Sequence, residues 1–181
     1  MEDEKKYYEY TISIERANIV AMIMAVPVVL IMALPYYFIW HGNIFHALSS
    51  SWWIFLLSLP VGIILHEGLH GITWAIFAKG GFRSIKFGIK WEYFTPYCHC
   101  DKPLRVWQYF LGAVMPLVVM GIIPWILGTI IGNELVVFFA MFYTWAAGGD
   151  IQAIWVMRRF SANDLVSDHP EELGFIVYRR D

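Results

Sequence analysis

The sequence predicts an all-α polytopic membrane protein with four transmembrane helices and a small cytoplasmic β-sheet or hairpin. Of its 181 residues, 59% are hydrophobic and 15% are charged, whereas soluble domains are about 45–50% apolar and about 25% charged. The segments Ala17–His66 and Val106–Asn133 contain no Asp, Glu, Lys or Arg, and about 20 apolar residues cross a bilayer. We therefore expect one membrane-embedded domain over residues 1–181, which excludes a soluble enzyme, a secreted disulfide scaffold and a disordered tail.

The four spans are expected, in chain order, at about residues 18–40, 52–78, 106–132 and 135–157. The last two spans are separated only by Asn133 and Glu134, beside Gly132. They should therefore form a tight antiparallel hairpin. A loop over residues 79–105 and a tail over residues 158–181 complete the domain.

Short strands are expected outside the spans. Hydrophobic and polar residues alternate along Tyr8–Glu15 and along Ile85–Tyr93, which is the period-two pattern of a β-strand. Phe175–Tyr178 is a third candidate strand. The loop and the tail should therefore carry a small β-structure.

The basic residues predict the orientation of the chain in the membrane. All 13 Lys and Arg residues fall in the N-terminal segment, the loop over residues 79–105 or the tail, and the other two loops contain none. Cytoplasmic loops are enriched in Lys and Arg. We therefore expect a multi-pass protein of the cell membrane with both termini cytoplasmic. A net charge of -2 gives no indication of a nucleic-acid partner.

The second span contains a candidate metal site, His66-Glu67-Gly68-Leu69-His70. Residues four apart share a face of a helix, so both imidazoles can reach one metal ion. In an H-E-x-x-H motif the glutamate acts as the general base. Ionisable residues within a span are costly and need partners or water. The alternative is a structural cluster in which these side chains hydrogen-bond between helices.

A third ligand is needed, because catalytic zinc sites take three protein ligands and keep one position open. Asp150, in Gly148-Gly149-Asp150, is the other acid embedded in a span. His70 lies nine residues before Lys79 and Asp150 lies eight before Arg158, so both lie about 12–14 Å inside those boundary charges. Asp150 is therefore the candidate ligand, unless it pairs with another polar group of the membrane.

These residues resemble a known family. The motif His66-Glu67-x-x-His70 near the cytoplasmic end of one span, with Asp150 in a later span, is similar to the site-2 proteases, which are intramembrane zinc metalloproteases. The resemblance implies a Zn²⁺ ion held by the two histidines and the aspartate. The chain more closely resembles the putative zincin peptidase family, small four-span proteins with an H-E-x-x-H and a late Gly-Asp.

Two features depart from the site-2-protease pattern. Ile151 follows Asp150, where those proteases usually have glycine, and the third span has Pro116 and Pro124 but not the expected asparagine. The resemblance therefore assigns no oxyanion-stabilising residue. Prolines within spans are otherwise expected to kink their helices.

The loop contains a second group of metal-ligand residue types, Cys98-His99-Cys100. C-x-C alone lacks the paired spacing of a zinc ribbon, and the cytoplasm keeps such thiols reduced. Three interpretations remain: a loop near the active site, a second metal site or ligand switch, and incidental composition.

The sequence therefore predicts an intramembrane zinc metallopeptidase that cuts membrane-embedded substrates near the cytoplasmic face, with Glu67 as its base. The expected partners are a membrane-protein or peptide substrate and the lipid bilayer, and the residues give no signal for an oligomeric state. One alternative is a non-proteolytic zinc-binding scaffold, or pseudoprotease. Another is a metal or proton transporter, which the lack of an inverted repeat disfavours.

Overall fold

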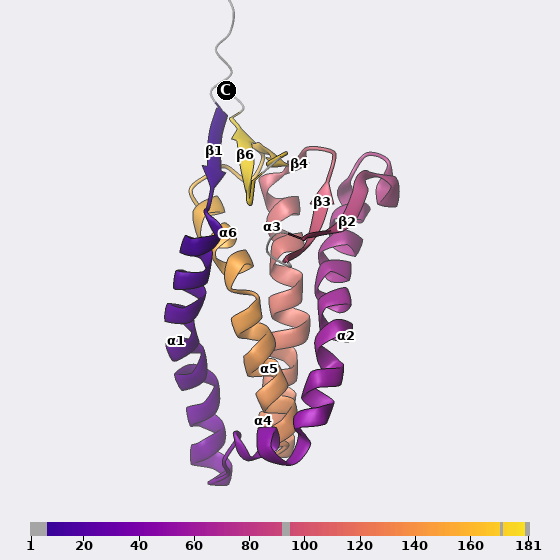
Figure 1. Cartoon of the computed structure of the whole chain (residues 1–181). Coiled ribbons are helices and arrows are strands. Elements are labelled where there is room, and N and C mark those ends of the chain that lie inside the picture. Colours follow the sequence, from indigo (N-terminus) through magenta and orange to yellow (C-terminus); the bar gives the residue numbers. More distant parts are fainter. Residues whose placement is uncertain (1–6, 92–94, 171, 180–181) are drawn as a thin grey trace, which may run out of the picture. The chain divides into compact units, whose positions relative to one another are not determined.

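A computed structural model describes residues 7–91, 95–170 and 172–179 of the chain, and most of these are helical (Figure 1). The helical elements are α1 (Ile14–Trp40), α2 (His46–Phe77), the 3₁₀ turn η1 (Gly81–Ser84), α3 (Val106–Pro116), the π-helix η2 (Leu117–Ile122), α4 (Ile123–Ile131), α5 (Glu134–Ala146) and α6 (Gly148–Met157). The strands are β1 (Tyr7–Thr11), β2 (Ile85–Lys90), β3 (Thr95–Cys100), β4 (Leu104–Arg105), β5 (Leu165–Asp168) and β6 (Gly174–Tyr178).

Within the described residues, three helical segments are long and apolar enough to cross a membrane: Glu15–Trp40, Ser49–Phe77 and Val106–Ile131. The fourth expected span is not one straight helix, because α5 and α6 meet at an angle of 52°. Ala147 ends α5, and Gly148 and Gly149 begin α6. Adjacent glycines are a common cause of such bends. The described part of the chain thus has three candidate spans, or four if the bent pair counts as one.

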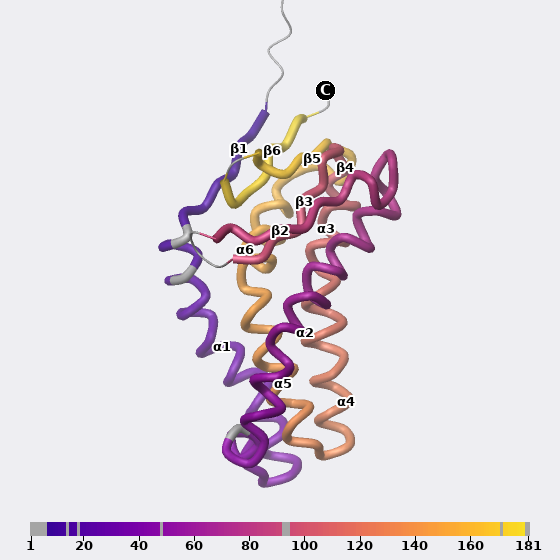
Figure 2. The backbone as a smooth tube through the Cα atoms, turned by 45° about the vertical axis from the view of Figure 1, so that its right-hand side comes forward, coloured from indigo at the N-terminus to yellow at the C-terminus, as the bar shows by residue number. Residues whose placement is uncertain are grey.

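The chain divides into two compact units, and we describe each by itself. The first, the sheet unit, comprises residues 7–17, 67–115 and 150–179. It holds a four-stranded antiparallel sheet in the order β1-β6-β5-β4 and a separate β2–β3 hairpin (Figure 2). The sheet buries Val166, Phe175 and Val177 against Leu104 of β4 and Met157 of α6. The tail is therefore part of this unit's hydrophobic core.

The expected strands are found, two of them shorter than expected and the third one residue longer. The first is β1, which ends at Thr11, because Ile14 and Glu15 of its predicted range belong to the first turn of α1. The second ends at Lys90, and residues 92–93 of its predicted range lie outside the described residues. The third is β6. Strands β3, β4 and β5 were not predicted, and β3 contains the Cys98-His99-Cys100 group that we expected in a loop.

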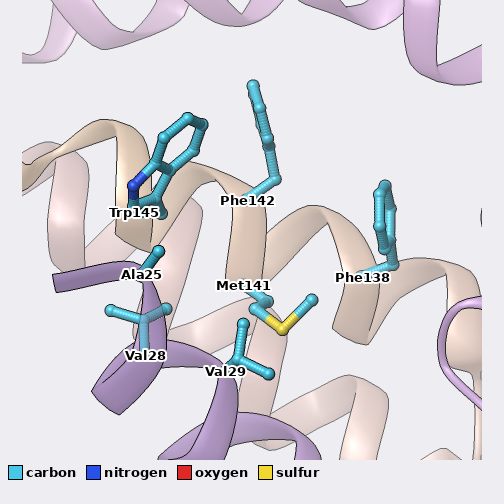
Figure 3. Close-up of a pocket in the computed structure, with 7 residues that line it drawn as sticks. All are labelled: Ala25, Val28, Val29, Phe138, Met141, Phe142 and Trp145. Carbon is cyan, nitrogen blue, oxygen red and sulfur yellow. The ribbon is translucent and has the colours of Figure 1, made fainter. Parts of the chain in front are cut away.

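The second unit, the helical unit, comprises residues 18–66 and 116–149. Its apolar core joins α1 to α5 through Val28, Met32, Val137 and Ala140. Beside this core, α1 and α5 border an open apolar groove of about 240 Å³ (Figure 3). Its lining residues are Ala25, Val28, Val29, Phe138, Met141, Phe142 and Trp145.

Several polar contacts between helices of this unit use backbone carbonyls as acceptors. Trp145 Nε1 donates to the Ala21 carbonyl at 2.8 Å. The Tyr143 hydroxyl donates to the Ser58 carbonyl at 3.0 Å. It lies against Gly62, where an added Cβ would come within 2.0 Å of the Tyr143 oxygen. Gly62 therefore allows α5 to approach α2 closely enough for this hydrogen bond.

We predict opposite effects of alanine at two glycines of α2. Gly62→Ala should displace the Tyr143 hydroxyl and break its bond to Ser58, lowering the thermal midpoint by about 3–6 °C. Gly68→Ala is the matched control, since no described atom lies within 4 Å of its added Cβ, and alanine is the better helix former by about 0.5–1 kcal/mol. Thermal unfolding in one detergent compares the two variants. An equal loss in both would contradict the proposed close approach at Gly62.

Candidate metal centre

The H-E-x-x-H motif lies within α2, so His66 and His70 are one helical turn apart on one face. The structure brings Asp150, at the start of α6, to these histidines. One side-chain ligand atom from each of His66, His70 and Asp150 lies within 4.8 Å of the other two. The three residues predicted as metal ligands therefore form one group in space.

The spacing of one ligand pair in this group fits a metal ion of zinc's size. His70 Nε2 lies 3.3 Å from Asp150 Oδ1. Two ligand atoms bound about 2.1 Å from a tetrahedral Zn²⁺ ion are separated by about 3.4 Å. His70 is 5% exposed, whereas the Asp150 side chain is 22% exposed. The imidazole is therefore fixed within the protein, and the carboxylate borders the outside of the unit.

The other nitrogen of His70 is hydrogen-bonded to α3. Its Nδ1 donates to the Gly112 carbonyl over 2.9 Å. Metal-binding histidines commonly donate their second N–H in this way, and the bond sets the tautomer and the ring orientation. Gly112 also has Trp74 above it, because an added Cβ would come 2.0 Å from Trp74 Nε1. The absence of a side chain at residue 112 is therefore required for the packing beside His70.

A stack of rings connects His70 to the tail. The imidazole stacks on Trp74 with ring centroids 5.2 Å apart, and Trp74 stacks on Tyr109 with centroids 4.8 Å apart. The Tyr109 hydroxyl donates to Asp168 Oδ1, and the backbone N–H of Cys100 donates to Asp168 Oδ2 over 2.7 Å. Asp168 of β5 thus accepts hydrogen bonds from both α3 and β3, at the end of the ring stack that begins at His70.

The carboxyl group of Asp168 is buried, and burial changes its pKa. Its side chain is 10% exposed, and His99 Nδ1 lies 3.6 Å from Oδ2. Burial raises the pKa of Asp168, while its hydrogen bonds from Cys100 and Tyr109 act in the opposite direction. A buried carboxylate is tolerated when donors surround it, and here those donors come from two different elements.

The β2–β3 hairpin packs against α2 beside the motif. Phe87 and Ile85 contact Gly71, where an added Cβ would lie 2.5 Å from the Phe87 ring. Glu67 and Gly71 are four residues apart and so share that face of the helix. Cys98 is paired with Phe87 across the hairpin, and the charge of Glu67 acts on its thiol. The hairpin therefore lies close to the predicted catalytic glutamate.

The Cys98-His99-Cys100 group is near the metal centre but is not a second one. Among the described residues, His66, His70 and Asp150 are the one group of three or more His, Cys, Asp or Glu residues placed to hold a metal ion. Cys100 is buried, and its thiol donates to the Lys102 carbonyl over 3.3 Å. His99 lies between Asp101 and Asp168. Of the three interpretations, the structure supports a segment next to the site.

A comparison with protein families matches this part of the chain. The family model described as "Putative zincin peptidase" matches residues 59–165, more than half of the sequence. The chain belongs to this family. The searches of curated proteins and of solved structures found no match. The matched range includes the motif, the β2–β3 hairpin and Asp150.

Membership of a zincin family supports a metallopeptidase that uses zinc. The donor set fits that metal, because two imidazoles and one carboxylate are among the ligand sets of catalytic zinc. Asp168 lies beyond the matched range. The rings of the stack lie within the matched range, and the tail carboxylate is therefore a feature of this chain that the family match does not cover.

Sequence reasoning identified the H-E-x-x-H motif but missed the residues around it: Trp74, Tyr109, Gly112 and Asp168. Trp74 is four residues after His70, which is a usable signal, because helical neighbours at this spacing contact each other. Asp168 gives no comparable signal, since its burial depends on how the tail packs against the hairpin. Its sequence context, Ser167-Asp168-His169-Pro170, is typical of a solvated turn.

We predict that both cysteines of this zincin react slowly with iodoacetamide at pH 8. Burial raises the pKa of the Cys98 thiol, and the charge of Glu67 raises it further; burial also raises the pKa of Cys100. The thiolate is the reactive form, so both rates should fall at least about tenfold below that of glutathione. Timed alkylation followed by mass spectrometry measures this, with the denatured chain as control. Equal rates in folded and denatured protein would contradict the placement of both thiols.

Proposed function

We propose that the chain is an intramembrane zinc metallopeptidase of the site-2-protease type, hydrolysing peptide bonds of membrane-embedded substrates near the cytoplasmic face. One observation carries the proposal. The ligand atoms of His66, His70 and Asp150 converge within 4.8 Å, in helices apolar enough for a bilayer, with Glu67 next to the first histidine. Ionisable groups at membrane depth are costly, and where they occur they usually mark a functional site.

Each residue of the cluster has a role in this proposal. His66, His70 and Asp150 would hold Zn²⁺, with His70 oriented by the Gly112 carbonyl. When bound, the ion supplies Lewis-acid chemistry and makes a water molecule acidic near neutral pH. Glu67 takes the proton of the attacking water and later delivers it to the leaving amine. The reaction therefore needs one base and no covalent enzyme intermediate.

A substrate span must be unwound locally before it can be cut, because helix carbonyls are hydrogen-bonded within the helix. Strand β2 is suited to hold an extended segment. Phe87 lies over Gly71, one residue after His70, and among the described residues β2 pairs only with β3. A peptide that adds to such an edge forms main-chain hydrogen bonds without needing a particular sequence.

The membrane placement of the site rests on the basic residues. All 13 Lys and Arg residues lie in segments that we assign to the cytoplasm, including both termini. His70 and Asp150 then lie toward the cytoplasmic end of their helices. The partners in this proposal are the lipid bilayer and a membrane-protein or peptide substrate.

We predict about one zinc ion per chain, held by the three proposed ligands. His66→Ala, His70→Ala and Asp150→Ala should each weaken zinc binding by more than about tenfold, since catalytic sites depend on all three ligands. Competition with a chromophoric chelator measures the affinity. The double variant Cys98→Ser/Cys100→Ser is the control and should bind zinc as the wild type does. Undiminished affinity in Asp150→Ala would remove this residue from the ligand set.

We predict that Glu67→Gln abolishes turnover while retaining zinc and the fold. Glutamine keeps the size of the side chain but cannot accept the proton, and losing one positioned base costs about 10²–10⁴ in rate. Quantitative proteomics of single-span membrane proteins, in cells carrying either form, should show uncut substrates accumulating. Glu134→Gln is the matched control, because Glu134 pairs with His46 at 2.8 Å in the helical unit.

The same comparison distinguishes the peptidase from the scaffold. A zinc-binding scaffold needs the metal ligands but not the base. If Glu67→Gln left every membrane protein processed as in the wild type, the peptidase proposal would be wrong. If His70→Ala, unlike Glu67→Gln, then changed the behaviour of the cells, the zinc-binding scaffold would be favoured.

A further inference from the structure

The acceptor that orients His70 lies four residues before a proline. In a regular α-helix the carbonyl of residue i accepts a hydrogen bond from the N–H of residue i+4. The residue four positions after Gly112 is Pro116, the last residue of α3. Proline has no backbone N–H. The Gly112 carbonyl therefore lacks its regular donor within the helix.

His70 supplies a donor at this carbonyl. Its Nδ1 donates over 2.9 Å, and the contact is buried. Because Gly112 has no side chain, Trp74 lies directly over it and stacks on the imidazole with an angle of 16° between the rings. The imidazole is thus fixed by a hydrogen bond at Nδ1 and by a ring against its face.

This bond decides which nitrogen is directed at Asp150. A neutral imidazole carries one N–H, and the other nitrogen is an acceptor. With the proton on Nδ1, Nε2 presents its lone pair, and Nε2 is the atom 3.3 Å from Asp150 Oδ1. The tautomer set at Gly112 is therefore the one that can bind a metal ion together with Asp150.

We propose that Pro116 is a positioning residue for His70: by lacking an N–H, it keeps the Gly112 carbonyl as an acceptor for Nδ1 and so presents Nε2 to the metal. The inference rests on the metal centre of the proposed function. Pro116 is followed directly by the π-helix Leu117–Ile122, as expected of a proline that disturbs its helix. The inference gives Pro116 a second role, in orienting His70.

Replacing each of two prolines by alanine tests the role. Pro116→Ala introduces an N–H that competes with His70 for the Gly112 carbonyl. Pro124→Ala is the matched control, because Pro124 also lies inside the third span but in the first turn of α4, away from residue 112. Both are made in the full-length chain in one detergent. Pro116 is fully buried, and its replacement by alanine removes packed ring atoms. The thermal midpoint of each variant is therefore measured to show that it is folded.

The first readout is zinc affinity by chelator competition. Loss of an outer-shell partner of a metal ligand typically weakens binding by about 10–100-fold. We expect the zinc affinity of Pro116→Ala to be about tenfold lower than that of the wild type, the low end of that range. A carbonyl has two lone pairs, so Gly112 can retain part of its hydrogen bond to His70. Pro124→Ala should bind as the wild type does. Equal affinities in all three proteins, or equal losses in both variants, would overturn the proposal.

The second readout is the tautomer of His70 in the metal-free protein carrying Asp150→Ala, where no Asp150 carboxylate holds a second proton on Nε2, from ¹⁵N chemical shifts of labelled histidine, with His70→Ala assigning the signal. In this background the otherwise unchanged chain and Pro124→Ala should show the proton on Nδ1, and Pro116→Ala a mixture of tautomers. An unchanged tautomer in Pro116→Ala would overturn the proposal. This measurement needs neither bound zinc nor a substrate, so it distinguishes failure of this inference from failure of the proposed peptidase function.

Discussion

The candidate metal centre depends on the hydrogen bond between His70 and the backbone of α3. A histidine inside an apolar helix has two nitrogens to satisfy, and each unsatisfied polar group costs free energy in a medium without water. Here Nδ1 is satisfied by the Gly112 carbonyl and Nε2 faces Asp150. A carbonyl within a helix is ordinarily occupied by its own helix. The imidazole can use this one because of the residue four positions later.

Other residues of the sheet unit support this arrangement around His70. Trp74 and Tyr109 extend the stack from His70, and Asp168 anchors the end of the stack by accepting the Tyr109 hydroxyl. Asp168 also accepts the Cys100 N–H, which fixes strand β3 and with it the hairpin that packs on α2. A single tail carboxylate thus supports both the ring beneath the metal ligand and the strand beside the predicted base. Catalytic sites need support of this kind, because small displacements of ligands are costly.

The sequence predicted the residues with strong chemical signatures and missed those defined by packing. H-E-x-x-H has a fixed helical spacing, and the matched depths of His70 and Asp150 followed from the rise of a helix; the structure brings both into one group. The bend at Ala147 was not predicted, although the two glycines before Asp150 are visible in the sequence. Strand β3 was missed because Pro96 and the two cysteines do not resemble a strand. Asp168 could not be found, since its partners lie 59 and 68 residues away in the chain.

The position of the hairpin bears on which class of function the cluster serves. A transporter needs a polar path across the membrane, usually at the interface of two related repeats. The packing of the β2–β3 hairpin on Gly71 does not provide such a path. A scaffold needs the metal but not a base beside it. A peptidase needs three features together: a metal-ligand group, an adjacent base and a surface that keeps the substrate extended. In this chain β2 packs on the helix turn that follows His70, on the face shared with Glu67. In the proposed peptidase, a segment added to β2 would therefore lie on the same face of the helix as the base, and such positioning of reacting groups is what catalysis requires.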